Sequence, residues 1–306
     1  MRCVWMVGVV VAAGACAGRP SVAQRFDAAQ AMRWMEYQVA AGPRVPGMPG
    51  HDSVEAWLVR ELRRRADSVE VQAFTWVTEA GDSLHRAGDT LHLANLLARF
   101  RPADPNRILY ITHWDTRPVA ENDPNPANRS KPIPGANDGA SGTALLLEVA
   151  DALKRAPPSV GVDLLFVDGE DYGDFTNNKD VLIGATWFAR HLPPGYRPLF
   201  GVLWDMIGGR DQKIYQESYS LQYAPEVVDR VWATADSLHL GAMFRPVDGG
   251  AITDDHVPLL QAGLRVIDVI GFENYRAWHH TLEDTPDKVS QTTLGDIGRL
   301  ALALLH

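Results

Sequence analysis

The feature that most constrains the fold is the stretch VDLLFVDGED, which covers residues 162–171. Its apolar, partly β-branched first half is typical of a strand buried inside an α/β sheet. The stretch ends in Asp168-Gly169-Glu170-Asp171, so two adjacent acids follow the carboxyl end of the strand. Ligands of open α/β sheets bind at this edge, and adjacent carboxylates repel unless a cation or a shared proton lies between them. A solvated acidic loop is the alternative interpretation, since acids are common on loops.

Apolar strands, polar loops and amphipathic helices alternate from Arg107 onward. This order predicts a three-layer α/β/α fold, in which helices cover both faces of a mixed, mostly parallel twisted sheet. No linker separates parts of the chain, so residues 24–306 are expected to form one domain. The expected strands are 69–77, 91–100, 108–112, 162–167, 199–203 and 265–270, and the expected helices are 26–42, 52–65, 143–155, 183–191, 224–238 and 294–305. Between them lie a Pro- and Gly-rich loop at 43–50 and a turn at Gly81-Asp82.

The charge balance excludes one large class of partners. The chain has 306 residues and a formal net charge of −9, which argues against a surface that binds nucleic acid. Its one basic cluster, residues 63–65, falls on an expected helix and is interpreted as a solvated face. The hydrophobic content of 46% is enough for a sizeable core.

The first 23 residues have the features of an export signal. Arg2 precedes a short apolar run, Val4–Ala15, that suits a secretory signal better than a membrane-spanning helix. Small residues precede Cys16, which resembles the lipid-bearing cysteine of a bacterial lipoprotein; cleavage after Ala23 is the alternative. Both alternatives place the protein outside the cytoplasm, in the periplasm or anchored by lipid to the bacterial envelope. Because Cys3 and Cys16 are the two cysteines of the chain, the remainder has no disulfide to form.

Acidic and imidazole groups recur at the expected strand ends or in the loops that follow them. Parallel strands bring such groups to one edge of the sheet, and together they form the oxygen and nitrogen donor set that Zn²⁺ accepts in catalytic sites. Unrelated helix caps and surface acids would be the ordinary structural explanation of each one taken singly. The candidates are His113, Asp115, Asp138, Glu170, Asp171, Asp205, Asp254 and His280.

The remaining histidines are given structural roles. His256 follows two acids and is expected to hydrogen-bond within its own loop. His279 and His280 are neighbours that do not easily face one ion together, so one is expected to be a ligand and the other to line the pocket or point away. The histidines expected on the surface or in the core are His51, His85, His92, His191, His239 and His306.

Several motifs in this order resemble the M28 family of zinc peptidases and, within it, the bacterial glutaminyl-peptide cyclotransferases. The resemblance extends from about Gly42 to the C-terminus. The motifs are HWDTRP at 113–118, GANDGASG at 135–142, DGEDYG at 168–173, WDMIGG at 204–209, TDDH at 253–256 and WHHTLEDT at 278–285.

The resemblance implies a role for each matching residue. It assigns Asp138, Asp171 and His280 to one zinc ion, with Glu170 as the acid/base carboxylate. Asp205 and Asp254 would form an acidic hydrogen-bond network behind Glu170. Two positions depart from the family pattern: Asp171 stands where many relatives have Glu, and His279 stands where a Trp is common. This departure leaves several candidates for the substrate wall: Trp204, Trp278 and His279, and the further aromatics near the motifs, Trp114, Tyr172, Phe175 and Trp187.

The resemblance implies cyclisation of an N-terminal Gln of peptides or proteins to pyroglutamate, with one zinc ion per chain. Glu170 would carry a proton from the substrate amine to the departing ammonia. The alternative is a two-zinc aminopeptidase, in which His113 and Asp205 bind a second ion and Asp138 bridges both. Asp254 favours the cyclase, because a hydrogen bond to Asp205 would keep Asp205 from a second metal. A binding module with a dead site is a third hypothesis, and the presence of Glu170 argues against it.

Overall fold

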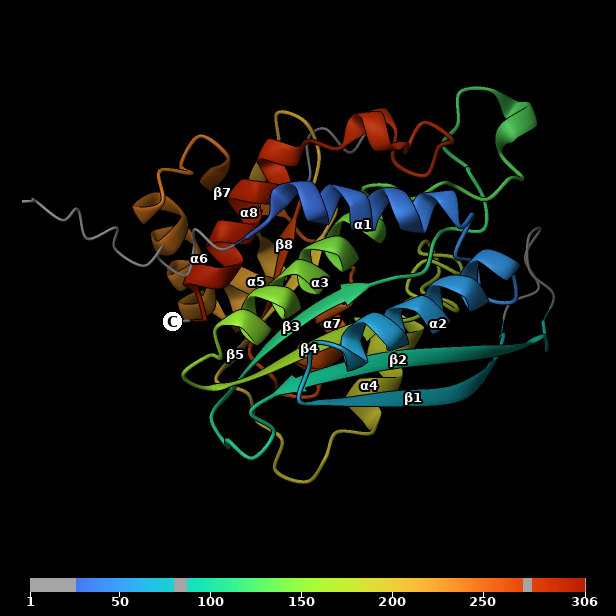
Figure 1. The fold of residues 1–306 in the computed structure, drawn as a ribbon. Coiled ribbons are helices and arrows are strands. Elements are labelled where there is room, and N and C mark those ends of the chain that lie inside the picture. The colour runs from blue at the N-terminus through green and yellow to red at the C-terminus, as the bar shows by residue number, and fades with distance from the viewer. Residues whose placement is uncertain (1–25, 80–86, 272–276, 306) are drawn as a thin grey trace, which may run out of the picture.

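The described residues, 26–79, 87–271 and 277–305 of a computed structural model, build an α/β structure around one large sheet (Figure 1). Six strands of this part of the chain lie in the order β1-β2-β4-β3-β5-β8. β1 and β2 pair antiparallel, as do β2 and β4, and the other neighbours are parallel. The strands are β1 (Ser68–Val77), β2 (Thr90–Phe100), β3 (Arg107–His113), β4 (Gly161–Val167), β5 (Phe200–Asp205) and β8 (Val266–Ile270). The predicted fold class is therefore confirmed.

The central strands are apolar because both faces of the sheet are covered. Every residue of β3 and β4 is buried. Side chains alternate between the faces, so Ile108 and Tyr110 enter one core whereas Leu109 and Ile111 enter the other. This two-sided burial explains the continuous apolar runs of the sequence.

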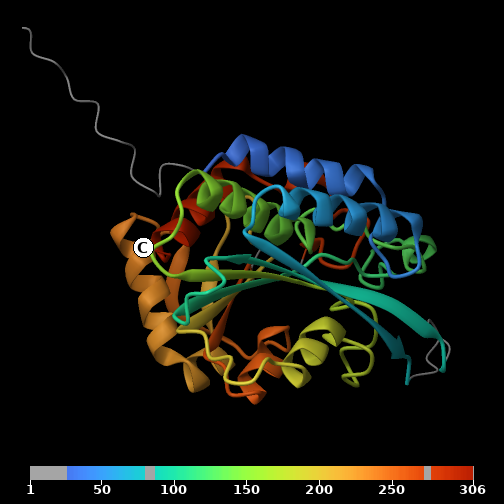
Figure 2. The same cartoon turned by 60° about the horizontal axis from the view of Figure 1, so that its bottom comes forward.

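Helices form a layer on each face of the sheet (Figure 2). One layer consists of α1 (Ala28–Ala40), α2 (Pro49–Arg63), α3 (Ala140–Arg155) and α8 (Gln291–Ala303), which contact one another. The opposite face carries α4 (Ile183–Arg190) and α7 (His256–Gln261), whose residues Phe188 and Leu259 pack in the second core. α6 (Pro225–Ser237) contacts α8 and the edge strand β8. Short 3₁₀ helices span Pro126–Asn128 and Pro286–Lys288.

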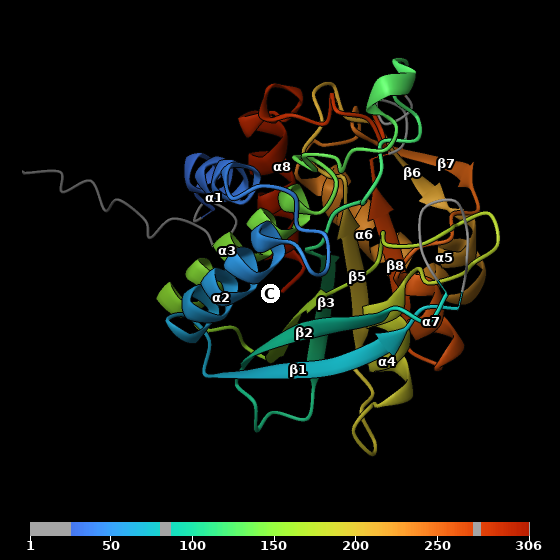
Figure 3. The same cartoon turned by 90° about the vertical axis from the view of Figure 1, so that its right-hand side faces the viewer.

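Four helices and strands were not predicted: α7, which contacts β8, and three others. β6 (Ile214–Glu217) and β7 (Phe244–Gly250) form a separate parallel pair, and α5 (Ser218–Tyr223) follows β6 directly (Figure 3). β7 reads FRPVDGG and is mostly exposed, so it has neither the apolar alternation nor the composition of a strand. β7 is therefore a strand because it pairs with β6, and not because of a pattern in its own sequence.

Three helices begin earlier than predicted, and one of them is α8, which starts at Gln291 instead of Leu294. α2 starts at Pro49 instead of the capping residues Asp52 or Ser53, because a proline fits the first helical position. α3 starts at Ala140 instead of Thr143, directly after Gly139. The predicted turn at Gly81-Asp82, and the leader with Cys16, lie outside the described residues. Within the described part, no helix has the length and apolar content to cross a bilayer.

Candidate functional site

The carboxyl ends of three parallel strands bring the predicted acids and imidazoles together. His113 ends β3 and Asp205 ends β5, while Glu170 and Asp171 follow β4. Asp138 arrives from the long loop between β3 and α3. Gly139, at φ +82°, allows the close approach of this loop, since a Cβ there would lie 2.6 Å from the Asp115 carbonyl oxygen. The turn therefore needs a glycine both for its conformation and for space.

The three predicted zinc ligands are neighbours in space. Nε2 of His280 lies 3.2 Å from Oδ1 of Asp171 and 3.7 Å from Oδ2 of Asp138. All three side chains are buried. Oδ2 of Asp171 is buried and has no hydrogen-bond partner among the described residues. Two carboxylates, one imidazole and an orphaned buried oxygen are the donor set that zinc takes, so these residues fit the ion that the resemblance implies.

Charge couples two of these ligands to each other. Burial alone would lower the pKa of His280, but the charge of Asp171 and hydrogen bonds to Asp171 and Glu121 raise it to about 9. Conversely, burial would raise the pKa of Asp171, and His280 and Arg117 hold it well below its usual range. Nδ1 of His280 lies 2.8 Å from Oε1 of Glu121, a carboxylate–histidine contact that fixes the ring and leaves Nε2 directed at the acids.

A second cluster shares Asp138. Nε2 of His113 lies 3.2 Å from Oδ1 of Asp138 and 3.0 Å from Oδ1 of Asp205. Ligand atoms of these three buried residues lie within 4.8 Å of one another. The structure therefore assembles the side chains that the two-metal alternative requires.

His279 and His280 lie beside the same cavity. Ligand atoms of Asp138, His279 and His280 also lie within 4.8 Å of one another. The rings of the two histidines are 3.5 Å apart between centroids. His279 thus lines the pocket, as expected for the histidine that is not the ligand, and its ring nitrogen also lies near the candidate ligand atoms.

Glu170 has an environment that strengthens its affinity for a proton. It is 7% exposed, lies at the cavity wall, and its Oε2 is 3.8 Å from Nδ1 of His113. Burial raises the pKa of Glu170 well above its ordinary value, and the nearby charges of Asp171, Asp254 and Asp255 add to the effect.

Asp254 does not make the predicted hydrogen bond to Asp205. Its Oδ1 accepts a hydrogen bond from the backbone N–H of Asp255 (2.6 Å), and its Oδ2 is buried without a partner among the described residues. Asp205 instead contacts His113. The prediction was wrong, because two ionised carboxylates have no proton to share; the charge of Asp205 instead adds to burial in raising the pKa of Asp254.

Two acids that carry no assigned role hold the ligand loops in place. Asp115 accepts hydrogen bonds from the backbone N–H groups of Glu170 (3.1 Å) and Asp171 (3.2 Å). Asp284 does the same for Asn137 (2.9 Å) and Asp138 (3.1 Å). Both acids lie inside the motifs of the sequence, but their partners are backbone groups that no pattern of side chains reveals.

Arg44 was missed altogether. Its guanidinium is fully buried, and it donates to the carbonyl oxygens of Trp114 (3.1 Å) and Gly135 (2.6 Å), among others. It thus ties the Pro- and Gly-rich loop to the segments that carry His113 and Asp138. The one available signal was an arginine inside an otherwise uncharged loop, at 43–50.

His51 lies in the core, one of the two expected locations, but it has an acidic partner that the sequence did not indicate. Its Nε2 lies 3.0 Å from Oδ1 of Asp168, the acid that ends the central strand. The His51 ring also stacks on Trp114 at 4.4 Å. The interaction joins residues 117 positions apart, so sequence proximity gave no sign of it.

Glu217 is a further residue that the sequence did not indicate, and it has several hydrogen-bond partners. Its carboxylate accepts hydrogen bonds from the N–H groups of Tyr219 (2.8 Å) and Ser220 (2.6 Å) at the start of α5. It also accepts from the N–H of Ile252 (3.1 Å) and lies 3.1 Å from Nε2 of His256. Because Ile252 and His256 flank Asp254, Glu217 fixes both ends of that segment. His256 therefore pairs outside its own loop, contrary to expectation.

The candidate zinc ligands line a cavity of about 470 Å³. Asp138, Glu170, Asp171, His279 and His280 line it together with Phe175 and Ile252.

Trp204 was a candidate for substrate contact, which is wrong, because it is fully buried and packs edge-on against Tyr110. Trp278 is half-buried and does not line this cavity either. Phe175, with the Arg117 guanidinium 5.6 Å from its ring centre, forms an aromatic part of the wall.

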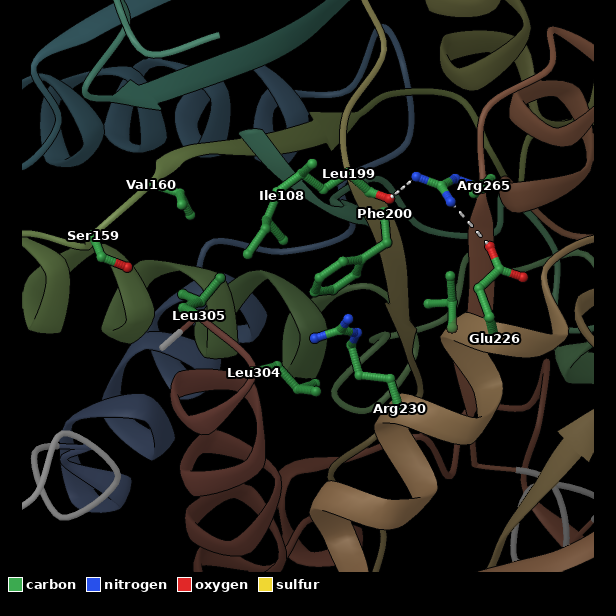
Figure 4. Close-up of a pocket in the computed structure, with 11 residues that line it drawn as sticks. Ile108, Ser159, Val160, Leu199, Phe200, Glu226, Arg230, Arg265, Leu304 and Leu305 are labelled. Atoms are coloured by element: carbon green, nitrogen blue, oxygen red, sulfur yellow. Dashed lines mark hydrogen bonds and ion pairs between the residues drawn. The ribbon is translucent and has the colours of Figure 1, made fainter. Parts of the chain in front are cut away.

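A second cavity, of about 300 Å³, lies at the opposite, amino-terminal edge of the sheet (Figure 4). Its floor is apolar and includes Ile108 and Phe200. The one acid among its described lining residues, Glu226, lies 3.4 Å from Arg265. This cavity has no set of metal donors, so the chemistry belongs to the carboxyl-terminal edge.

Comparisons with known proteins identify the family. A sequence model of peptidase family M28 matches residues 95–305. The structure of a glutaminyl cyclase from Bacteroides thetaiotaomicron, bound to N-acetylhistamine, is 34% identical, covers 92% of this chain and 98% of that chain, and has a TM-score of 0.85. A zinc-dependent exopeptidase from Parabacteroides distasonis is 33% identical with the same coverage and a TM-score of 0.83. The glutaminyl-peptide cyclotransferase of Bos taurus is 25% identical over 84% of this chain and 76% of its own length.

Proposed function

The chain belongs to peptidase family M28, and on this premise we propose that it is a zinc-dependent glutaminyl-peptide cyclotransferase. The observation that carries the proposal is the buried group of Asp138, Asp171 and His280 with Glu170 beside it in one cavity. The similarity to a solved bacterial glutaminyl cyclase over 92% of the chain supports the same activity. The substrate would be a peptide or protein that begins with Gln.

Three residues would hold the ion. Asp138, Asp171 and His280 supply two oxygens and one nitrogen, and Glu121 orients the His280 ring from behind. Bound zinc polarises the γ-carbonyl of the substrate glutamine and makes its carbon more electrophilic.

Glu170 would move the proton. It takes a proton from the substrate α-amine, whose nitrogen then attacks the side-chain amide carbon. A carbon–nitrogen bond forms, the bond to the amide nitrogen breaks, and Glu170 returns the proton to the departing ammonia. Nucleophile and electrophile belong to one molecule, so the cavity must fold the substrate into an attack geometry. Asp205 and Asp254 line the same cavity and would bind the positively charged amine before it reacts.

A two-zinc aminopeptidase remains the second candidate, because His113, Asp138 and Asp205 also lie within 4.8 Å of one another. A second ion there would activate water for hydrolysis. The names of the most similar relatives support this candidate less than the cyclase.

Metal content and product identity separate the two candidates. The purified protein is freed of metal with a chelator, titrated with zinc, and assayed with a Gln-initiated peptide and a Leu-initiated peptide. The cyclase predicts full activity at one zinc per chain, with ammonia and pyroglutamyl peptide as products. Release of free amino acid at two zinc ions per chain would instead establish the aminopeptidase.

We further propose that residues 1–23 direct export, with Cys16 as a lipid attachment site. The short apolar run beside Arg2 and the small residues before Cys16 support this assignment. In a bacterial host, labelling with a fatty-acid analogue should mark the full chain but not Cys16→Ser. Equal labelling of both, or none of either, would leave cleavage after Ala23 as the mode of export.

A further inference from the structure

The backbone at His280 places two neighbouring imidazoles on the same side of the chain. In an extended segment, successive side chains point to opposite sides. His280 instead has φ +51°, in the left-handed region that residues other than glycine rarely adopt. The His279 and His280 rings consequently lie 3.5 Å apart between centroids, with an interplanar angle of 33°. Such a conformation costs free energy, and residues that retain one are concentrated at functional sites.

The His279 ring also faces the zinc ligands. Its ligand nitrogen, that of His280 and an oxygen of Asp138 all lie within 4.8 Å of one another. Zinc bonds to nitrogen and oxygen are about 2.1 Å long, so donors in a tetrahedral site are about 3.4 Å apart. A contraction of at most about 1.4 Å between these donor atoms would bring them to the spacing of a tetrahedral site.

We propose that His279 is a fourth protein ligand of the zinc ion in the substrate-free protein. With Asp138, Asp171 and His280 it would complete a four-coordinate site. This inference rests on the proposed zinc site, and not on the identity of the reaction.

A catalytic zinc needs one position that substrate can take, so one of the four ligands must exchange. The surroundings of the two histidines differ in the way that this requires. His280 is 6% exposed and held at Nδ1 by Glu121. His279 is half-buried and lines the cavity that the substrate would enter. His279 would therefore be the ligand that exchanges for the substrate carbonyl.

Zinc affinity tests the inference without any assay of turnover. Zinc is titrated against a chromophoric chelator with the wild-type protein and with His279→Phe, which keeps an aromatic ring in the cavity wall and removes both nitrogens. Loss of a direct ligand should weaken binding at least about 10-fold, the lower end of what loss of an outer partner costs. His191→Gln, which changes a surface imidazole bonded to the Trp187 carbonyl, should bind zinc as the wild type does.

Cobalt substitution gives a second readout, with His279→Asn as a further variant in case phenylalanine disturbs the fold. The visible absorption of the Co²⁺ protein should change in both variants, because one nitrogen donor is lost. Unchanged zinc affinity and an unchanged cobalt spectrum would overturn the inference, even if turnover fell. Weaker zinc binding in a protein without cyclase activity would support the ligand role and reject the proposed reaction.

Discussion

The two edges of the sheet both bury carboxylates, but they bond them differently. At the amino-terminal edge, Asp163 is fully buried and accepts hydrogen bonds from Arg107 Nε (2.8 Å) and Nη2 (2.5 Å). The hydroxyl of Tyr196 donates to the same carboxylate at 2.8 Å. At the carboxyl-terminal edge, Asp171 and Asp254 each keep one buried oxygen without a hydrogen-bond partner among the described residues.

The contrast distinguishes a carboxylate that stabilises the fold, Asp163, from carboxylates that are available to a ligand, Asp171 and Asp254. A buried carboxylate costs free energy unless hydrogen bonds and an opposite charge compensate it. Arg107 compensates Asp163 within the chain. At the carboxyl-terminal edge several acids share few cations, so part of the compensation must come from a bound ion, a shared proton or a cationic substrate. The four predictions below test this contrast.

The largest effect is expected for Glu170→Gln. Loss of a proton-transferring carboxyl group should lower kcat for Gln-peptide cyclisation by about 10²–10⁴-fold. The zinc content should stay at the wild-type value, since Glu170 is not one of the proposed ligands. The melting temperature should be equal or higher, because the change removes one of several crowded acids. A variant that loses its zinc or melts earlier would show that Glu170 has a ligand or structural role instead.

At the opposite edge, Asp163→Asn should do the reverse. Removing one partner of a buried ion pair leaves the Arg107 guanidinium uncompensated and should cost about 3–5 kcal/mol of unfolding free energy. Urea unfolding monitored by tryptophan fluorescence measures the loss. The kcat of the folded fraction should be unchanged, because Asp163 is at the edge remote from the metal cluster. A fall in kcat with little loss of unfolding free energy would contradict the assignment of Asp163 to the stability of the fold.

Glu217→Gln should have an intermediate effect. Both oxygens of Glu217 have hydrogen-bond partners, but the residue lies near Asp254, which has an oxygen without one. Its loss should cost about 1.5–3 kcal/mol, the contribution of hydrogen bonds to a charged group. It should also lower kcat, because Glu217 holds Ile252 and His256 on either side of Asp254. Asp248→Asn, which changes an exposed acid bonded to Ser218 at the same helix, is the matched control and should alter neither quantity by as much.

The difference in unfolding free energy between the wild type and Glu217→Gln should depend on pH. Burial would raise the pKa of Glu217, but His256 and the backbone N–H groups lower it from 4.5 to about 2. A depressed carboxyl pKa gives stability that is present above the unfolded value and lost as the pH falls toward the folded one. The advantage of the wild type over Glu217→Gln should therefore be constant at neutral pH and shrink from about pH 4.5 downward. An advantage that persists at pH 3 without change would contradict the assigned role of the charge.

The smallest effect is expected for Glu226→Gln in the second cavity. Glu226 and Arg265 are both more than half exposed and lie 3.4 Å apart, so water and salt screen their attraction. The change should cost no more than about 1 kcal/mol and become smaller at high salt. Urea unfolding at low and high ionic strength measures it. A larger cost would mean that this cavity is stabilised by charge, as Asp163 is.

The sequence was informative where chemistry and strand order coincide. His113, Glu170, Asp171 and Asp205 each end or follow an apolar strand, so their convergence was predictable from the direction of parallel strands. The residues that hold them in place were not predictable. Asp284 and Arg44 bond to backbone groups, and backbone donors and acceptors are the same in every sequence.

The candidate substrate wall illustrates the same limit. Trp204 lies next to Asp205, yet it points into the core, because neighbours on a strand face opposite sides of the sheet. Phe175 was one of several aromatics near the motifs, and how its loop folds back decided that it, and not Trp204, lines the cavity. Proximity in sequence is therefore a poor guide to which aromatic side chain meets the substrate.

The sequence alone determined the fold class, the edge of the sheet that carries the site and the kinds of donor found there, because local periodicity fixes the strands and their polarity. Only the tertiary structure decided that His279 and His280 face the same acids, that His51 reaches Asp168, and that Glu217 braces the Asp254 segment. These contacts depend on one left-handed residue and on side chains far apart in the chain, and neither leaves a local pattern in the sequence.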